Sequence, residues 1–220
     1  MANRLPRIFL AAGLGTVLTP TEAVTLSGHV DADGQPLAQV VVTAQPNGTN
    51  SATKPKTKPK PLALDQKGRE FLPHVLAVQT GTPVFFPNSD DIKHHVYSFS
   101  PAKRFEIKLY SGTPAKPILF DRPGVVVLGC NIHDWMLGFV FVTDSEYVTQ
   151  TDNQGQWSLD LPPGEYRLSL WHPDAVDGTV GVANLPVPAT SPLHYSLTLK
   201  THRPSGKPPY SLQMQEYDGF

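Results

Sequence analysis

The stretch Gly129–Met136 (GCNIHDWM) organises the chain and contains its single cysteine, Cys130, among 220 residues. His133 is the third residue after Cys130, and Met136 is the third residue after His133. Thiolate, imidazole and thioether groups are soft or borderline ligands, which suit copper better than magnesium or calcium. A blue-copper site for electron transfer uses two imidazoles, one thiolate and a weak axial thioether. The stretch can therefore supply three of these four ligands.

A second imidazole is available upstream, in Asn88–Val96 (NSDDIKHHV), where His94 and His95 precede a predicted strand. Adjacent residues of a strand point to opposite faces of the sheet. We therefore expect only one of these two histidines to face Cys130 and His133. The alternation alone does not decide which.

Short apolar runs separated by Pro, Gly and Asn turn signals extend from Leu62 to Thr143. The candidate strands are Phe71–Val78, Val84–Phe86, Val96–Phe99, Phe105–Leu109, Ile118–Phe120, Val125–Leu128 and Phe139–Val142. Seven or so short strands at this spacing predict a sandwich or barrel. No stretch shows a long 3.6-residue period, so the predicted fold class is all-β.

Residues 61–143 resemble a cupredoxin, the family of plastocyanin, pseudoazurin and amicyanin. The family carries an Asn six residues before its first ligand His, an interval kept by Asn88 and His94, so the resemblance selects His94. It also carries a Pro-Gly turn, five strand residues and a ligand Cys, matching Pro123-Gly124 and Cys130. The pattern C-x-x-H-x-x-M-x-G-x-V-x-V matches Cys130, His133, Met136, Gly138, Val140 and Val142 in the short amicyanin spacing.

The resemblance implies a Greek-key β-sandwich with one type 1 (blue) copper held by His94, Cys130, His133 and Met136. Three nearby residues depart from the family. His95 stands where Asn is usual, Gly129 replaces a common aromatic, and Asp134 replaces the Pro of amicyanin. These differences leave the ligands intact and bear on the reduction potential and the partner surface.

Two segments outside this region share another pattern. The segment Leu26–Val42 and the pattern D-x-x-G-x-W-x-L-x-L-P-x-G-x-Y-x-L, from Asp152 to Leu168, resemble the two halves of a carboxypeptidase regulatory-like (transthyretin-like) β-sandwich. We interpret residues 24–46 and 144–200 as one small sandwich interrupted by the cupredoxin domain, since exposed loops tolerate insertions. In the alternative, the N-terminal segment adds an edge strand to the central domain.

The N-terminus has the pattern of a signal peptide covering residues 1–23. Arg4 and Arg7 precede the apolar run Ile8–Leu18, and small residues close the segment at Thr21 and Ala23. The apolar run is short for a membrane span, and an uncleaved anchor or a mobile tail is the alternative. The signal predicts a periplasmic protein, in which metal ligation gives the lone thiol of Cys130 a reason to persist.

Two segments lack apolar periodicity. Residues 47–60 alternate Lys and Pro and predict an extended linker, and residues 201–220 predict a mobile tail. Lys54, Lys56, Lys58 and Lys60 could alternatively form a docking patch for an acidic partner. The net charge of −1 offers no basic surplus for nucleic acid.

The predicted site leaves no open coordination position for a substrate, so a carrier is expected rather than an enzyme. No serine–histidine–acid set or phosphate-binding glycine loop is visible. The resemblance implies electron exchange at the edge of His133, within a patch of Ile132, Trp135 and Leu137. Partners would be periplasmic redox proteins such as c-type cytochromes, a dehydrogenase or an oxidase.

Two other functions remain open. A periplasmic copper chaperone or storage protein would use the same ligands and release the metal. A carbohydrate- or protein-binding module would work through the outer sandwich and keep a degenerate cupredoxin. Among the remaining histidines, structural roles are expected for His74 and His172, whereas His29, His194 and His202 belong to no visible constellation.

Overall fold

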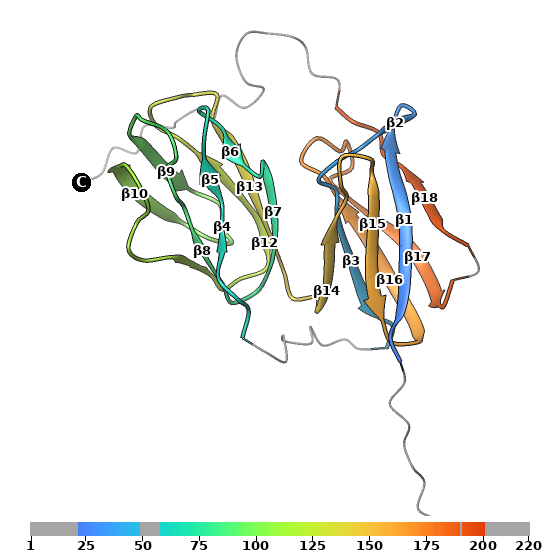
Figure 1. The fold of residues 1–220 in the computed structure, drawn as a ribbon. Helices are drawn as coiled ribbons and strands as arrows, with labels where there is room; N and C mark the ends of the chain where they lie inside the picture. Colours follow the sequence, from blue (N-terminus) through green and yellow to red (C-terminus); the bar gives the residue numbers. More distant parts are fainter. Residues whose placement is uncertain (1–21, 49–57, 190, 201–220) are drawn as a thin grey trace, which may run out of the picture.

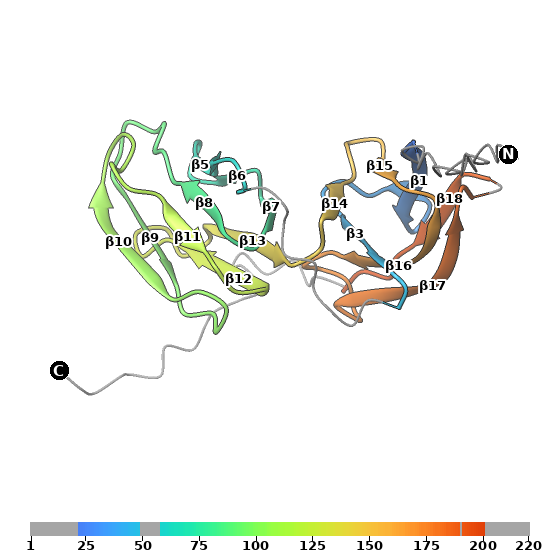
Figure 2. The same ribbon diagram turned by 90° about the horizontal axis from the view of Figure 1, so that it is seen from below.

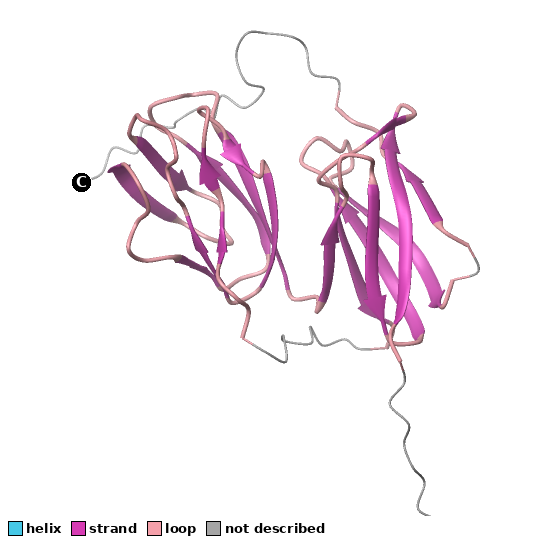
Figure 3. Cartoon of the chain, viewed as in Figure 1, coloured by secondary structure: helices cyan, strands magenta, loops and turns pink. Residues whose placement is uncertain are grey.

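A computed structural model describes residues 22–48, 58–189 and 191–200 (Figure 1). Most of the predicted signal peptide, the predicted tail with His202, and the linker residues Lys54 and Lys56 lie outside the described residues. The described chain is all-β, as predicted, and consists of strands joined by loops and turns (Figure 3). Within the described residues there is no helix long and apolar enough to span a membrane.

The segment from residue 62 to residue 143 forms a unit that we call the central unit. Its strands are β4 (Leu62–Ala63), β5 (Asp65–Gln66), β6 (Phe71–Leu72), β7 (Val75–Gln79), β8 (Thr82–Phe85), β9 (His94–Ser98), β10 (Phe105–Tyr110), β11 (Ile118–Phe120), β12 (Gly124–Gly129) and β13 (Leu137–Thr143). A five-stranded sheet has the order β10-β9-β12-β13-β7, and a three-stranded sheet has the order β11-β8-β4.

The core of the central unit is a cluster of buried aromatic and branched side chains. Phe71, Phe86 and Phe120 are its largest fully buried members, and Cys130 and Met136 belong to the same cluster. Fully burying each large apolar side chain contributes about 1.5–3 kcal/mol. The predicted strand Phe71–Val78 is divided into β6 and β7 at Pro73, which has no backbone N–H for a ladder.

The strands before and after this segment pair with one another and form what we call the flanking unit. They are β1 (Val24–Ala32), β2 (Gln35–Pro36), β3 (Val41–Pro46), β14 (Tyr147–Gln150), β15 (Gln156–Leu161), β16 (Gly164–Trp171), β17 (Thr179–Val187) and β18 (Leu193–Ser196). One sheet has the order β15-β1-β18, with β2 also on β1, and the other has the order β14-β3-β16-β17. Strands β1 and β3 therefore pair with strands of the flanking unit. The described pairings do not support the alternative in which the N-terminal segment adds an edge strand to the central unit.

The two units lie side by side in both views (Figure 1, Figure 2). A third apolar cluster joins them, in which Val75 and Phe139 of the central unit meet Val41 and Trp171 of the flanking unit. The ring centroids of Phe139 and Trp171 are 6.0 Å apart in an edge-on arrangement. The outer face of the β7–β13 ladder is thus covered by the second unit.

Side-chain amides also connect the units. Gln150 Oε1 accepts from the Ala77 amide at 3.0 Å, and Gln150 Nε2 donates to the Val75 carbonyl at 3.1 Å. Gln39 Oε1 accepts from the Val75 amide at 2.8 Å. Strand β7 is at the edge of its sheet, so these contacts satisfy backbone groups that would otherwise be left unpaired.

Candidate metal centre

The loop between β12 and β13 contains three of the predicted ligands. Strand β12 ends at Gly129, Cys130 follows it, and β13 begins at Leu137. A hydrogen bond from the Met136 amide to the His133 carbonyl, at 2.9 Å, closes a turn within the loop. The side chain of Cys130 is buried in the core of the central unit, whereas His133 is partly exposed.

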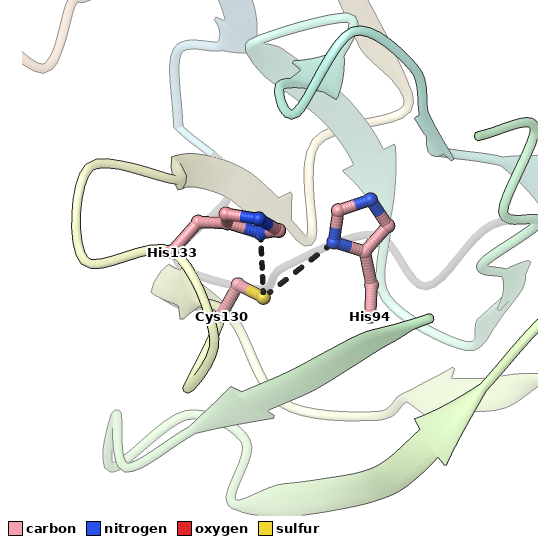
Figure 4. A group of neighbouring side chains, drawn as sticks. All are labelled: His94, Cys130 and His133. Carbon is pink, nitrogen blue, oxygen red and sulfur yellow. Dashed lines mark hydrogen bonds between the residues drawn. The ribbon is translucent and has the colours of Figure 1, made fainter. Parts of the chain in front are cut away.

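The first residue of β9 provides the second imidazole. The Sγ atom of Cys130 is 3.7 Å from Nδ1 of His94 and 4.0 Å from Nδ1 of His133 (Figure 4). One donor atom of each of these three residues lies within 4.8 Å of the other two. The fold thus brings two ring nitrogens to one thiol from segments that are 36 residues apart.

The orientation of His94 is fixed by Asp90. Nε2 of His94 lies 2.8 Å from Oδ2 of Asp90, and this carboxylate also accepts from the backbone amides of Gly68 and Arg69 at 2.7 and 2.9 Å. Burial alone would raise the pKa of Asp90, but the bonds from His94, Arg69 and Gly68 outweigh it and lower the pKa. Because Nε2 of His94 contacts Asp90, the other ring nitrogen, Nδ1, faces Cys130.

Asn88 shapes the loop that leads to His94. Its side-chain amide donates to the carbonyls of Ile92 and Tyr110, at 2.8 and 3.0 Å, while its Oδ1 accepts from the Asp90 amide at 3.1 Å. The last of these bonds is an Asx turn, a common way for Asn to hold a tight loop. This is a physical reason for an asparagine six residues before His94.

Tyr110 holds the same loop through hydrogen bonds. Its hydroxyl donates to the Phe86 carbonyl at 2.7 Å and contacts Nε2 of Gln66, which also donates to the Pro87 carbonyl. Burial raises the pKa of Tyr110 to about 12, so the hydroxyl stays protonated at neutral pH. The Tyr110 hydroxyl and Nε2 of Gln66 are thus hydrogen-bonded, whereas Oε1 of Gln66 is buried without a hydrogen-bond partner.

His95 points away from Cys130. Its Nε2 makes an ion-pair contact with Oε1 of Glu106 at 2.9 Å, on the other side of β9. His74 packs edge-on against Phe139, with ring centroids 5.3 Å apart. His172 is buried in the flanking unit, where its Nδ1 accepts from the Asp174 amide at 3.2 Å.

The space next to Gly129 is filled by Tyr97. The two residues are cross-strand partners, and a Cβ on Gly129 would stand 2.8 Å from both Cζ and Oη of Tyr97. The aromatic group that Gly129 lacks is thus provided from the facing strand. Burial raises the pKa of Tyr97, with further contributions from the nearby Cys130 and Asp134.

Met136 is 3% exposed and packs in the same apolar cluster as Cys130. Of the residues predicted for a surface patch around His133, Ile132 and Trp135 are exposed, by 48% and 54%. The Trp135 ring lies beside that of His133, with centroids 5.1 Å apart. Leu137 does not join the patch, because it starts β13 and packs in the cluster between the two units.

The protonation of His133 favours metal binding. Burial lowers its pKa, and the proximity of His94 and Arg69 lowers it further, against a smaller opposing effect of Asp90. A neutral imidazole retains the lone pair that a metal requires. The donor set of two imidazoles and a thiol therefore fits a copper or zinc ion better than a calcium or magnesium ion.

Solved copper proteins show structural likeness to part of the chain. A copper-containing nitrite reductase (NirK) from Thermus scotoductus SA-01 is 26% identical over 44% of this chain and 25% of its own length, with a TM-score of 0.36. A purple cupredoxin from Nitrosopumilus maritimus is 21% identical over 37% of this chain and 99% of its own, with a TM-score of 0.33. An amicyanin variant is 17% identical over 46% of this chain and 98% of its own, with a TM-score of 0.35.

No protein-family model and no curated protein matches the chain. The matched part of the chain covers 25% of the length of the nitrite reductase. It covers 99% of the purple cupredoxin and 98% of the amicyanin variant.

Asp90 is the functional residue that the sequence patterns missed. It was visible only as one of two adjacent aspartates, and nothing in the pattern assigned it to His94. Its position four residues before a ligand histidine is a signal that could have been used.

Proposed function

We propose that the chain is an exported copper protein that carries single electrons between periplasmic redox partners. The observation that carries this proposal is the convergence of Nδ1 of His94 and Nδ1 of His133 on Sγ of Cys130, at 3.7 and 4.0 Å. When bound, copper would supply a one-electron couple between Cu(I) and Cu(II). Met136, buried in the same cluster as Cys130, would provide a thioether as the fourth ligand.

The protein contributes rigidity and a fixed orientation of the His94 ring. His94 is fully buried and held by Asp90, while Cys130 lies in the packed core of the central unit. Close-packed interiors resist displacement. Ligands held in this way move little when the charge of a bound ion changes, which favours fast electron exchange over binding of a substrate.

The surface around His133 supports exchange with another protein. Trp135 and Ile132 expose apolar area beside the more accessible of the two imidazoles. Aromatic residues are frequent at the centre of protein contacts, where they exclude water. We therefore assign the contact with c-type cytochromes or another redox partner to this surface, which we call the Trp135 surface (Ile132, His133 and Trp135).

The test is a visible spectrum of the untagged full chain after addition of one equivalent of Cu(II). An intense blue absorption from thiolate-to-copper charge transfer is expected, and it should be absent in Cys130→Ala. A colourless wild-type protein would overturn the assignment of a blue copper site. The same sample distinguishes a copper chaperone, since ready release of the metal to a chelator, without reversible oxidation and reduction, would argue against a carrier.

A further inference from the structure

Three side chains converge on the flanking unit, outside the Cys130 site. His29 and Asp31 lie on β1, and His194 lies on β18. The two strands are parallel, with His29 directly opposite His194 and Asp31 opposite Ser196. One donor atom from each of the three side chains lies within 4.8 Å of the other two.

These side chains occupy the face of β1 that points away from the core. Leu26 and Val30 pack in the core of the flanking unit, so His29 and Asp31, at the alternate positions, face outward. Asp31 is nevertheless only 7% exposed, and its carboxylate contacts Nε2 of His194. The hydrogen bond from Ser196 and the contact with His194 lower the pKa of Asp31, so the carboxylate is ionised at neutral pH.

A ring nitrogen of His29 completes the group. The rings of His29 and His194 have centroids 5.3 Å apart. Gly155, in the turn before β15, lies next to this nitrogen, and a Cβ at this position would stand 3.0 Å from His29 Nε2.

Two imidazoles and one carboxylate form a donor set that suits zinc. Imidazole and carboxylate ligands bind Zn²⁺ at about 2.0–2.2 Å, so donor atoms that share such an ion lie about 3–4 Å apart. Calcium and magnesium prefer oxygen ligands alone. A simple ion pair between Asp31 and His194 would not require His29 beside them.

We propose that His29, Asp31 and His194 bind a divalent ion with the ligand preferences of zinc, at a site separate from Cys130. The ion would connect β18 to β1. Strand β18 is short and lies at the edge of its sheet, where β1 is its strand partner. A shared ion would fix this edge strand to the sheet and stabilise the flanking unit.

The test counts Zn²⁺ bound to the untagged full chain by isothermal titration calorimetry. We expect His194→Ala to bind one equivalent fewer than the parent, or to bind that equivalent at least about tenfold more weakly, since even losing a supporting group costs about 10–100-fold. His29→Ala should lose the same equivalent. The exposed position of the His194 side chain, at 62%, makes its removal compatible with folding.

The number of Zn²⁺ ions bound per chain also distinguishes the site at His29, Asp31 and His194 from the Cys130 site. Cys130→Ala should remove a different equivalent, and the double variant with His194→Ala should lose both. If the Cys130 site bound no metal, the difference between the parent and His194→Ala would still be one equivalent. The control is His202→Ala, outside the described residues, which should bind as the parent does.

Two results would overturn the proposal. One is an unchanged stoichiometry and affinity in His194→Ala, and the other is a parent whose bound zinc disappears entirely in Cys130→Ala. A second measurement guards against misfolding. Zinc should raise the thermal midpoint of Cys130→Ala, because a ligand that binds only the folded state stabilises it, and this rise should be absent when His194→Ala is added.

Discussion

Asp90 and His94 form a hydrogen-bonded pair, with Oδ2 of Asp90 2.8 Å from Nε2 of His94, and this pair sets which nitrogen of His94 faces Cys130. The backbone amides of Gly68 and Arg69 donate to the same carboxylate. The pair therefore links the strand that begins at His94 to the turn at Gly68 and Arg69.

Asp90→Ala should weaken copper binding by about 10–100-fold, as is typical when the partner of a ligating histidine is lost. His94 could then take either tautomer and would be less firmly oriented. Competition with a chelator of known affinity measures the change. The matched control is Asp91→Ala, which removes the same charge from an exposed neighbour and should leave the affinity unchanged.

Gly129 and Tyr97 should behave as a coupled pair. Gly129→Phe places its Cβ within 2.8 Å of the Tyr97 ring, and such overpacking costs about 1–3 kcal/mol of the free energy of unfolding. Adding Tyr97→Ala should recover most of this loss, because it vacates the space. Urea denaturation of the two single variants and the double variant gives the coupling energy. Strictly additive effects would show that the two residues do not share this space.

Trp135→Glu should slow electron exchange with a soluble c-type cytochrome by at least about tenfold, the effect of losing about 1.4 kcal/mol at an aromatic contact. The blue absorption should be unchanged, since Trp135 is 54% exposed and outside the donor set. Stopped-flow kinetics measure the rate. Val176→Glu places the same charge on an exposed residue of the flanking unit and should have little effect. Loss of colour in Trp135→Glu would instead indicate a structural role.

Gln150→Leu should lower the free energy of unfolding by about 1–3 kcal/mol, because it leaves the Ala77 amide and the Val75 carbonyl without their partner. The two units should also become less coupled, and calorimetry should show two separated thermal transitions. Gln154→Leu, at an exposed position of the flanking unit, is the control and should have a small effect. A single unchanged transition in Gln150→Leu would contradict this role for the interface.

His172 should make stability depend on pH. Burial lowers its pKa in the folded protein, with a partial opposing effect of Asp174 and a small lowering by His74, whereas an unfolded chain has a pKa of about 6.5. Below that pH the unfolded state binds more protons, so the stabilising contribution is complete above about pH 6.5 and declines as the pH falls towards the folded-state pKa. Urea denaturation at neutral and mildly acidic pH should therefore show a stability difference between the parent and His172→Gln that changes with pH. A constant difference would rule out this effect.

The all-β fold and the grouping of His94, Cys130 and His133 could be reached from the sequence, because strand alternation and ligand spacing are local patterns. The pairing of Asp31 with His194 could not, since the two residues are 163 positions apart and only the register of β1 on β18 brings them together. The prediction that Leu137 belongs to the surface patch around His133 is wrong for a related reason. An apolar side chain fits a surface patch and a contact between units equally well. Only the packing of the flanking unit against the central unit shows which of the two Leu137 makes.

The pairing of β1 with β15 also sets an order for folding. Leu26 is opposite Leu159, and β3 pairs with β14 and β16, whereas the central unit is continuous from β4 to β13. The chain is synthesised from its N-terminus, so residues 24–46 are made before their strand partners β14, β15 and β16. These partners become available only after the whole central unit has been synthesised. Contacts this distant in sequence slow folding, and an unpaired strand is open to wrong pairing. The central unit can complete its own core first and then present Val75 and Phe139 as a surface on which the late strands assemble.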